Sequence, residues 1–302
     1  MSVLFPFRAW LRNPQFRNPV TWGFVALLAV PPFAMSLETS SGDEGLSKAV
    51  FGIYFAVAWF LVLRALIAPA RIRVVLVLTV MAVALVVGGP LALALERALD
   101  APRYDNLVLG IVTVAVPEEL AKLLPVAALV LFHRPVRQML GPREFLYLGT
   151  VSGLVFGAVE GIDYANHQPS TTGVILVWRL LTDPIVHACW AGLSGYFLGL
   201  AVRYREPGPV LAISGVGLAV PAVLHGLNNA SSGEYGLIWA AVVAVSALLL
   251  LGYARIGLIA APPQCPAPAG ADVLADPPTV RMPVVRGPGS EPRSGLSSTY
   301  RR

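Results

Sequence analysis

Several ionisable side chains of this sequence lie within apolar stretches, where charged groups are rare. They are Glu118, Glu119, Lys122, Glu160, His187 and His225. Carboxylates crowded into poorly solvated surroundings can share protons, so that one acts as a base while another keeps its proton. A histidine can shuttle protons or donate to an oxyanion. These residue types therefore permit amide hydrolysis by water that a glutamate activates.

The same residue types could instead hold a metal ion. Two histidines and one glutamate are an adequate ligand set for zinc with an open position, and Glu160, His187 and His225 are the candidate ligands. The sequence contains no HExxH motif, so a zinc site would have to be assembled from separate helices. It also lacks a credible Gly-x-Ser-x-Gly elbow or Walker-type loop, which argues against a serine hydrolase or an ATPase. The residues alone leave metal-dependent and glutamate-only chemistry open.

Helical spacing gives two of the polar residues a supporting role. Lys122 follows Glu118 at i+4 and Glu119 at i+3, so its ammonium group can neutralise either carboxylate. Asn228 follows His225 within one turn and is a candidate supporting residue. We expect Lys122 to tune the glutamate pair rather than to react itself.

Glycines and prolines accompany these residues. The glycines recur at every fourth position beside the Glu160 face, at Gly149, Gly153, Gly157 and Gly161. Such a small-residue stripe lets another helix approach closely. Pro117, Pro184 and Pro221 shortly precede Glu118, His187 and His225. Because proline removes a backbone hydrogen bond and bends a helix, the pattern predicts loosened helices around a polar cavity.

The composition indicates that these helices cross a membrane. Of 302 residues, 56% are hydrophobic and 13% are charged, whereas soluble proteins carry roughly 25% charged residues. The net charge of +5 is typical of basic cytoplasmic loops rather than of nucleic-acid binding. Two cysteines cannot form a disulfide framework. We expect a multi-pass protein of the cell membrane.

The predicted fold is an all-α bundle of about eight transmembrane spans, each close to the length that crosses a bilayer. The predicted spans are Val20–Leu37, Ala49–Ile67, Val74–Leu95, Leu107–Phe132, Phe145–Ala165, Val174–Val202, Pro209–Asn229 and Leu237–Ala254. Arginines cluster in alternate loops, which predicts that both termini are cytoplasmic. The stretch Val174–Val202 is unusually long and contains Pro184, which favours a short interfacial or re-entrant helix followed by the true span. The first span reads as an anchor rather than as a cleaved signal sequence.

Three regions follow from this pattern. Residues 1–19 form a cytoplasmic segment, and residues 20–256 form a transmembrane domain. The family resemblance given below implies that this domain is peptidase-like, with its catalytic core at about 107–229. Residues 257–302 are rich in proline, glycine and serine and cannot bury enough apolar surface to fold. We expect them to be a disordered cytoplasmic tail.

Four motifs on successive spans resemble a known family. Glu118-Glu119-Leu-Ala-Lys122 matches EExxK, and Phe156-Gly-Ala-Val-Glu160 matches FxxxE. His187 and the run Leu224-His225-Gly-Leu-Asn228 complete the order. The set resembles the PrsW family of intramembrane proteases, relatives of the type II CAAX prenyl endopeptidases, over about residues 107–229. A glutamate at 160, where the CAAX enzymes have histidine, favours the PrsW branch. The resemblance implies cleavage of membrane-anchored proteins in the bilayer, with anti-sigma factors as the named example, and the family is commonly described as metalloprotease-like.

The sequence thus predicts a membrane endopeptidase. Glu118 or Glu119 would be the general base, and Glu160 a second acid or a ligand. His187 and His225 would stabilise the oxyanion or bind a metal ion. A proton-coupled transporter would use similar buried residues, but inverted internal repeats are not evident. A non-catalytic scaffold is disfavoured because every motif position is filled.

Overall fold

The computed structural model describes residues 18, 21–25, 44–69, 72–99, 106–132, 140–167, 174–204, 206–231 and 236–259. All of them lie in the first of two compact units, Met1–Pro262, and their regular secondary structure is entirely helical. The helices are α3 Glu44–Ile67, α4 Val74–Val83, η2 Ala84–Gly88, α5 Gly89–Ala98, α6 Leu107–Gly110, η3 Ile111–Ala115, α7 Val116–Phe132, α9 Pro142–His167, α10 Val174–Ala201, α11 Pro207–Ser231 and α12 Leu237–Ile259.

The predicted all-α membrane fold is confirmed. Six helices in the described part of the chain are long and apolar enough to cross a bilayer: Lys48–Ile67, Val74–Ala98, Pro142–His167, Ile175–Ala201, Pro207–Ser231 and Leu237–Gly257. The chain is therefore a multi-pass integral membrane protein. The predicted span Leu107–Phe132 is also helical, as α6, η3 and α7, but it is not among the six, since three charged residues lie near its middle.

Two predictions concern residues outside this description. Of the predicted first span, only residues 21–25 are described, and they are helical. The proposed tail lies outside the described residues from position 260 onward. The count of eight spans, the cytoplasmic termini and the three domain boundaries therefore stay predictions.

The prediction of a re-entrant helix before Pro184 is wrong. Helix α10 runs without interruption from Val174 to Ala201 and contains Pro184 in its interior. A proline removes one hydrogen bond from the helix ladder. The close packing of α10 against its neighbour, described next, keeps the segment helical on both sides of Pro184.

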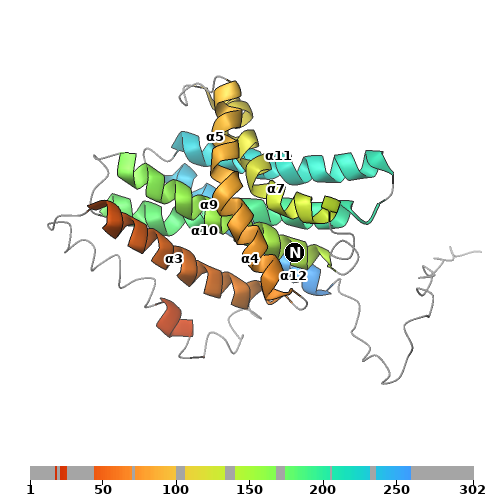
Figure 1. The fold of residues 1–302 in the computed structure, drawn as a ribbon, viewed down its shortest axis with the longest axis horizontal. Coiled ribbons are helices and arrows are strands. Elements are labelled where there is room, and N and C mark those ends of the chain that lie inside the picture. Colours follow the sequence, from red (N-terminus) through yellow and green to blue (C-terminus); the bar gives the residue numbers. More distant parts are fainter. Residues whose placement is uncertain are drawn as a thin grey trace, which may run out of the picture. The chain divides into compact units, whose positions relative to one another are not determined.

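Helices α9 and α10 form the centre of the bundle and lie side by side (Figure 1). In an apolar 18-residue stretch of each of these two spans 78% of residues are buried, against 22 to 33% in the corresponding stretches of the four others. The predicted glycine stripe explains their close approach. A Cβ atom at Gly149 would overlap the carbonyl oxygen of Ala191, and one at Gly153 would overlap that of His187. The stripe therefore sets the positions along α9 and α10 at which the two helices are in contact.

Two π-helical turns flank the polar residues. Helices α4, η2 and α5 follow one another as a continuous rod that crosses α7 and α9 (Figure 1). The second π-turn, η3, directly precedes α7 and packs against α11. Pro117 follows this turn and has no N–H with which to continue the ladder, which accounts for the predicted loosening here.

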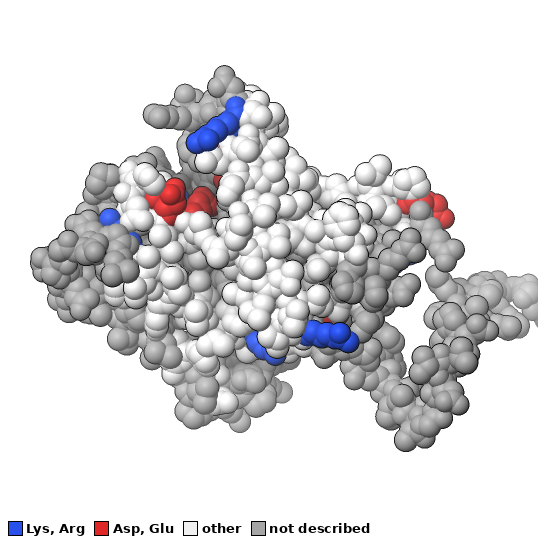
Figure 2. All heavy atoms as spheres, in the orientation of Figure 1, with Lys and Arg blue, Asp and Glu red and all other residues white. Residues whose placement is uncertain are grey.

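Charged atoms are sparse on the face shown in Figure 2. Acidic atoms surface in a recess between α5 and the adjoining end of α9 (Figure 2). The broad area between this recess and the basic side chains is uncharged in this view. That distribution is the one expected of a surface covered by lipid tails.

Candidate active site

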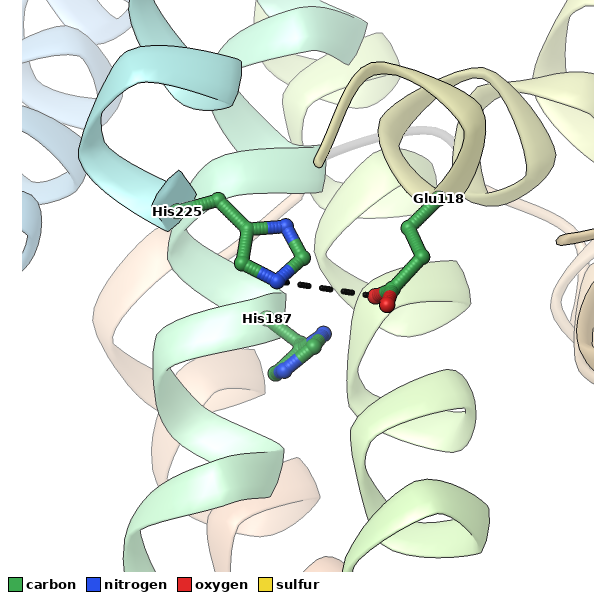
Figure 3. Close-up of side chains that lie close together, drawn as sticks. All are labelled: Glu118, His187 and His225. Atoms are coloured by element: carbon green, nitrogen blue, oxygen red, sulfur yellow. Dashed lines mark ion pairs between the residues drawn. The ribbon is translucent and has the colours of Figure 1, made fainter. Parts of the chain in front are cut away.

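Three candidate residues from three different helices converge at one point. Glu118 comes from the beginning of α7, His187 from the middle of α10 and His225 from α11, and their side chains point at one another (Figure 3). One ligand atom of each residue lies within 4.8 Å of those of the other two. All three residues are buried. Spacing along the chain could not predict this meeting, which depends on how the helices pack.

The two neighbouring glutamates of the EExxK motif differ in their contacts. Glu119 is fully buried, and its Oε1 accepts hydrogen bonds from Lys122 Nζ at 2.7 Å and from His225 Nδ1 at 3.0 Å. Glu118 Oε2 lies 3.4 Å from Lys122 Nζ and 3.6 Å from His225 Nε2. Among the described residues this oxygen has no hydrogen-bond partner. Each glutamate therefore has one oxygen, Oε2, without a hydrogen-bond partner among the described residues. They differ in that Glu119 holds Lys122 and His225 through Oε1, whereas Glu118 is the glutamate grouped with both histidines within 4.8 Å.

His225 is oriented by its contact with Glu119. A carboxylate only accepts hydrogen bonds, so the Nδ1 of His225 carries the proton in this contact. The neutral ring then has its lone pair on Nε2, and Nε2 faces Glu118. A carboxylate that fixes the tautomer of a histidine in this way is common behind metal ligands.

His187 lies in the opposite arrangement. Its Nδ1 is 2.8 Å from Lys122 Nζ. Because an ammonium group only donates, Nδ1 accepts, and the proton of the neutral ring belongs on Nε2. Nε2 lies 3.2 Å from Glu160 Oε2. Glu160 is the most accessible of the three glutamates, with 32% of its side chain exposed.

Lys122 is the fully buried centre of this network. Besides its contacts with the glutamates and His187, its Nζ lies 4.7 Å from the ring centroid of Phe156 and 5.6 Å from that of Trp190. Its backbone carbonyl accepts a hydrogen bond from Ser152 Oγ at 2.6 Å, which joins α7 to α9. A buried ammonium with carboxylates and aromatic faces around it is a stabilised charge.

The model of the PrsW family of intramembrane metalloproteases matches residues 46–254 of the chain. This match covers more than half of the sequence. The chain belongs to the PrsW family. The match begins within α3 and ends within α12, so it includes every helix that forms the site. No curated protein and no solved structure shows significant similarity to the chain.

Membership of the PrsW family makes the protein a membrane peptidase, a hydrolase that acts on membrane-anchored substrates within the bilayer. The family description also names a metal ion. The donor atoms fit such an ion, because one carboxylate and two imidazoles suffice for a three-ligand site with an open position. Two of them, Glu118 Oε2 and His225 Nε2, are buried and lack a hydrogen-bond partner within the described part of the PrsW chain. His187 offers the third nitrogen only when its contact with Lys122 is exchanged.

The remaining sequence-predicted residues lie around this centre. Glu160 contacts His187 but lies outside the Glu118–His187–His225 group, which differs from the predicted metal set in containing Glu118. Asn228 is buried near the end of α11, and its Oδ1 has no hydrogen-bond partner among the described residues. The roles of Glu160 and Asn228 stay predictions.

Two residues of this region were missed by the sequence analysis. Glu96 lies one residue beyond the predicted span Val74–Leu95, yet it belongs to α5, is partly buried and interacts electrostatically with Glu160 and Lys122. Trp190 was counted as part of an apolar span, although it packs directly against both histidines. Its position three residues after His187, on the same helix face, was the available signal.

Proposed function

We propose that the protein is an intramembrane endopeptidase whose reactive centre is Glu118 with His187 and His225, and that its substrates are single-span, anti-sigma-factor-like membrane proteins. The observation that supports this proposal most is the convergence of one carboxylate and two imidazoles within 4.8 Å in the interior of the bundle. Two of these atoms, Glu118 Oε2 and His225 Nε2, have no hydrogen-bond partner among the described residues, so they give a water molecule or a peptide carbonyl groups to bind.

Glu118, His187 and His225 would hold the metal ion named in the family description. When bound, such an ion supplies a Lewis acid for the scissile carbonyl and a hydroxide near neutral pH. Glu118 Oε2 and His225 Nε2 face each other, and neither has a hydrogen-bond partner among the described residues. These two atoms are therefore the ones best placed to bind the ion. Glu119 orients His225 through Nδ1.

Glu160 would move the proton in this scheme. It is partly exposed, unlike Glu118 and Glu119, so it can exchange protons with water. Its carboxylate lies 3.2 Å from His187 Nε2, which lets it accept a proton near the reacting atoms and return that proton to the leaving amine. Lys122 would keep the glutamate pair neutralised and stay out of the bond-making steps.

A metal-independent version of the same reaction is supported by the contact between Lys122 and His187. With Nδ1 of His187 accepting from Lys122, Nε2–H is a donor that can stabilise an oxyanion. Glu118 would then be the general base that activates water. Both versions use the same three side chains. They differ in whether Glu118 holds the metal ion or acts as the base, and in whether His187 offers a lone pair or an N–H.

Cleavage by the reconstituted protein tests the proposed function. Wild-type protein in proteoliposomes should cleave a panel of single-span membrane proteins, and the double variant Glu118→Gln/Glu119→Gln should lose about 100- to 10,000-fold in rate, the usual effect of removing a general base. Glu206→Gln, which alters an exposed carboxylate before α11, should keep the wild-type rate. Wild-type processing by the double variant would end the hydrolase proposal. A proton flux without any peptide product would support the transporter instead.

Metal content separates the two versions of the mechanism. The metal-dependent version predicts about one equivalent of zinc in purified protein, the stoichiometry of a single three-ligand site. His225→Asn should lower the zinc content, whereas His167→Asn should not, because His167 is exposed and contacts only Asp163 among the pairs described. Full activity after exhaustive chelation would rule out the metal-dependent version and leave Glu118 as the base.

A further inference from the structure

Trp190 packs against both histidines of the site. It is fully buried on α10, three residues after His187. Its ring is stacked on that of His225, with centroids 4.6 Å apart and planes at 16°. The ring of His187 lies 5.1 Å away at 58°. One indole therefore touches two imidazoles that come from different helices.

The stack with Trp190 fixes the plane of the His225 ring, which the hydrogen bond to Glu119 alone does not fix. The bond from Nδ1 to Glu119 holds the imidazole at one atom, and the ring could still turn about that contact. A flat aromatic face against the imidazole removes this freedom, since offset stacking favours nearly parallel planes. With both contacts in place, Nε2 of His225 is directed at Glu118.

Trp190 is in turn oriented from α12. Its Nε1 donates to Ser246 Oγ at 2.9 Å, and Ser246 Oγ donates to the carbonyl oxygen of Val242 at 2.8 Å. Because the hydroxyl proton is directed to Val242, a lone pair of Oγ is left for the indole N–H. Ser246 is fully buried, so no water replaces this acceptor.

We propose that Trp190, held by Ser246, is a positioning residue that fixes the imidazole plane of His225 and so aims Nε2 at Glu118. This inference rests on the proposed function and adds to it two residues, Trp190 and Ser246, that lie outside the Glu118–His187–His225 group. It also gives α12 a role in the reaction, through Ser246, although none of the residues that form the centre comes from this helix.

Three variants remove one part of this arrangement each. Ser246→Ala removes the acceptor, Trp190→Phe keeps an aromatic face without the N–H, and Trp190→Leu removes the face. Misplacing a reacting group by about 1 Å can cost on the order of 100-fold in rate. We expect about 100-fold loss of kcat in Trp190→Leu and about 10-fold in the two milder variants, with KM unchanged. Ser246→Thr retains the hydroxyl and should restore most of the kcat lost in Ser246→Ala.

A matched control separates positioning from packing. Tyr196 is a buried aromatic residue on the same helix, and its ring contacts Phe197 and Tyr253. Tyr196→Leu should lower the thermal midpoint about as much as Trp190→Leu while kcat stays at the wild-type value. Trp190 variants that lose thermal stability but keep wild-type kcat would overturn the proposal.

A spectroscopic readout keeps this inference independent of the proposed function. The chain has 4 histidines, so their imidazole proton resonances can be assigned one by one by substitution. A stacked indole should shift the His225 ring protons upfield, and the shift should shrink in Ser246→Ala and vanish in Trp190→Leu. Unshifted His225 resonances in the wild type would contradict the positioning role. Shifts that respond as expected in a protein without cleavage activity would support the positioning of His225 and place the failure in the proposed function.

Discussion

The central helix α9 and the outer helix α12 are both apolar spans, yet Gly153 of α9 and Gly252 of α12 lie in very different surroundings. At Gly153 of α9 an added Cβ atom would overlap the backbone of His187, whereas at Gly252 of α12 it would meet nothing within 4 Å. The centre of the bundle holds buried ionisable groups against closely packed backbones, and the outer helices present apolar side chains outward. The difference teaches that apolar composition is enough to make a membrane span. The site also needs small residues at particular positions of α9, where the backbone of α10 comes close.

The largest expected effect comes from filling the contact between α9 and α10. Gly153→Leu should prevent accumulation of folded protein, because the side chain would have to displace the backbone that carries His187. Overpacking of a core typically costs about 1–3 kcal/mol even without a backbone clash. Gly252→Leu should fold and cleave like the wild type. Size-exclusion profiles and thermal midpoints in detergent measure both, and equal behaviour of the two variants would contradict the comparison.

A smaller but still large effect is expected from removing the buried cation of the centre. Lys122→Met leaves Glu118 and Glu119 without their counter-charge, and breaking a buried ion pair typically costs about 3–5 kcal/mol. The folded fraction should keep part of its cleavage rate, because Lys122 takes no part in the bond-making steps. Lys48→Met, at the beginning of the outer helix α3, should change thermal stability much less. The comparison would fail if both variants melted at the same temperature.

The smallest effect in this series concerns single hydroxyl groups. Ser152→Ala removes the buried hydrogen bond to the carbonyl of Lys122, and such a loss typically costs about 1 kcal/mol. Thr79→Val removes a hydroxyl on the exposed face of α4, which bonds only within its own helix. Its effect should lie within about 0.5 kcal/mol of zero. Thermal midpoints of the two variants, measured side by side, show whether loss of the buried hydroxyl costs more stability than loss of the exposed one.

The positions of the helices followed well from the sequence, because apolar length is the main signal of a membrane span. The exception was the region before Pro184, where the predicted break does not occur and α10 is continuous. The cost of one proline is local, whereas the packing of α10 against the glycines of α9 extends along the helix. That packing depends on a partner helix and is not visible in the hydropathy of α10 alone.

The members of the site followed from residue type, but their pairing did not. Glu118 and Glu119 are neighbours in sequence, and their side chains leave α7 in directions about 100° apart. Only the packed structure shows that Glu119 meets Lys122 and His225 on one oxygen, while Glu118 is the glutamate that lies within 4.8 Å of ligand atoms of both histidines. The role of Trp190 could not be predicted, because an aromatic residue in an apolar span does not stand out from the other apolar residues around it.

The measurement that tests the central claim most directly compares the cleavage rates of Glu118→Gln and Glu119→Gln in proteoliposomes, with thermal midpoints recorded in parallel. The account predicts that Glu118→Gln retains the fold and loses about 100- to 10,000-fold in rate, because it removes the reactive carboxylate. Glu119→Gln keeps an oxygen that can accept from Lys122 and His225, so it should lose less activity and more stability. A Glu118→Gln variant that cleaves at the wild-type rate, or that outperforms Glu119→Gln, would contradict the assignment of Glu118 as the reactive glutamate.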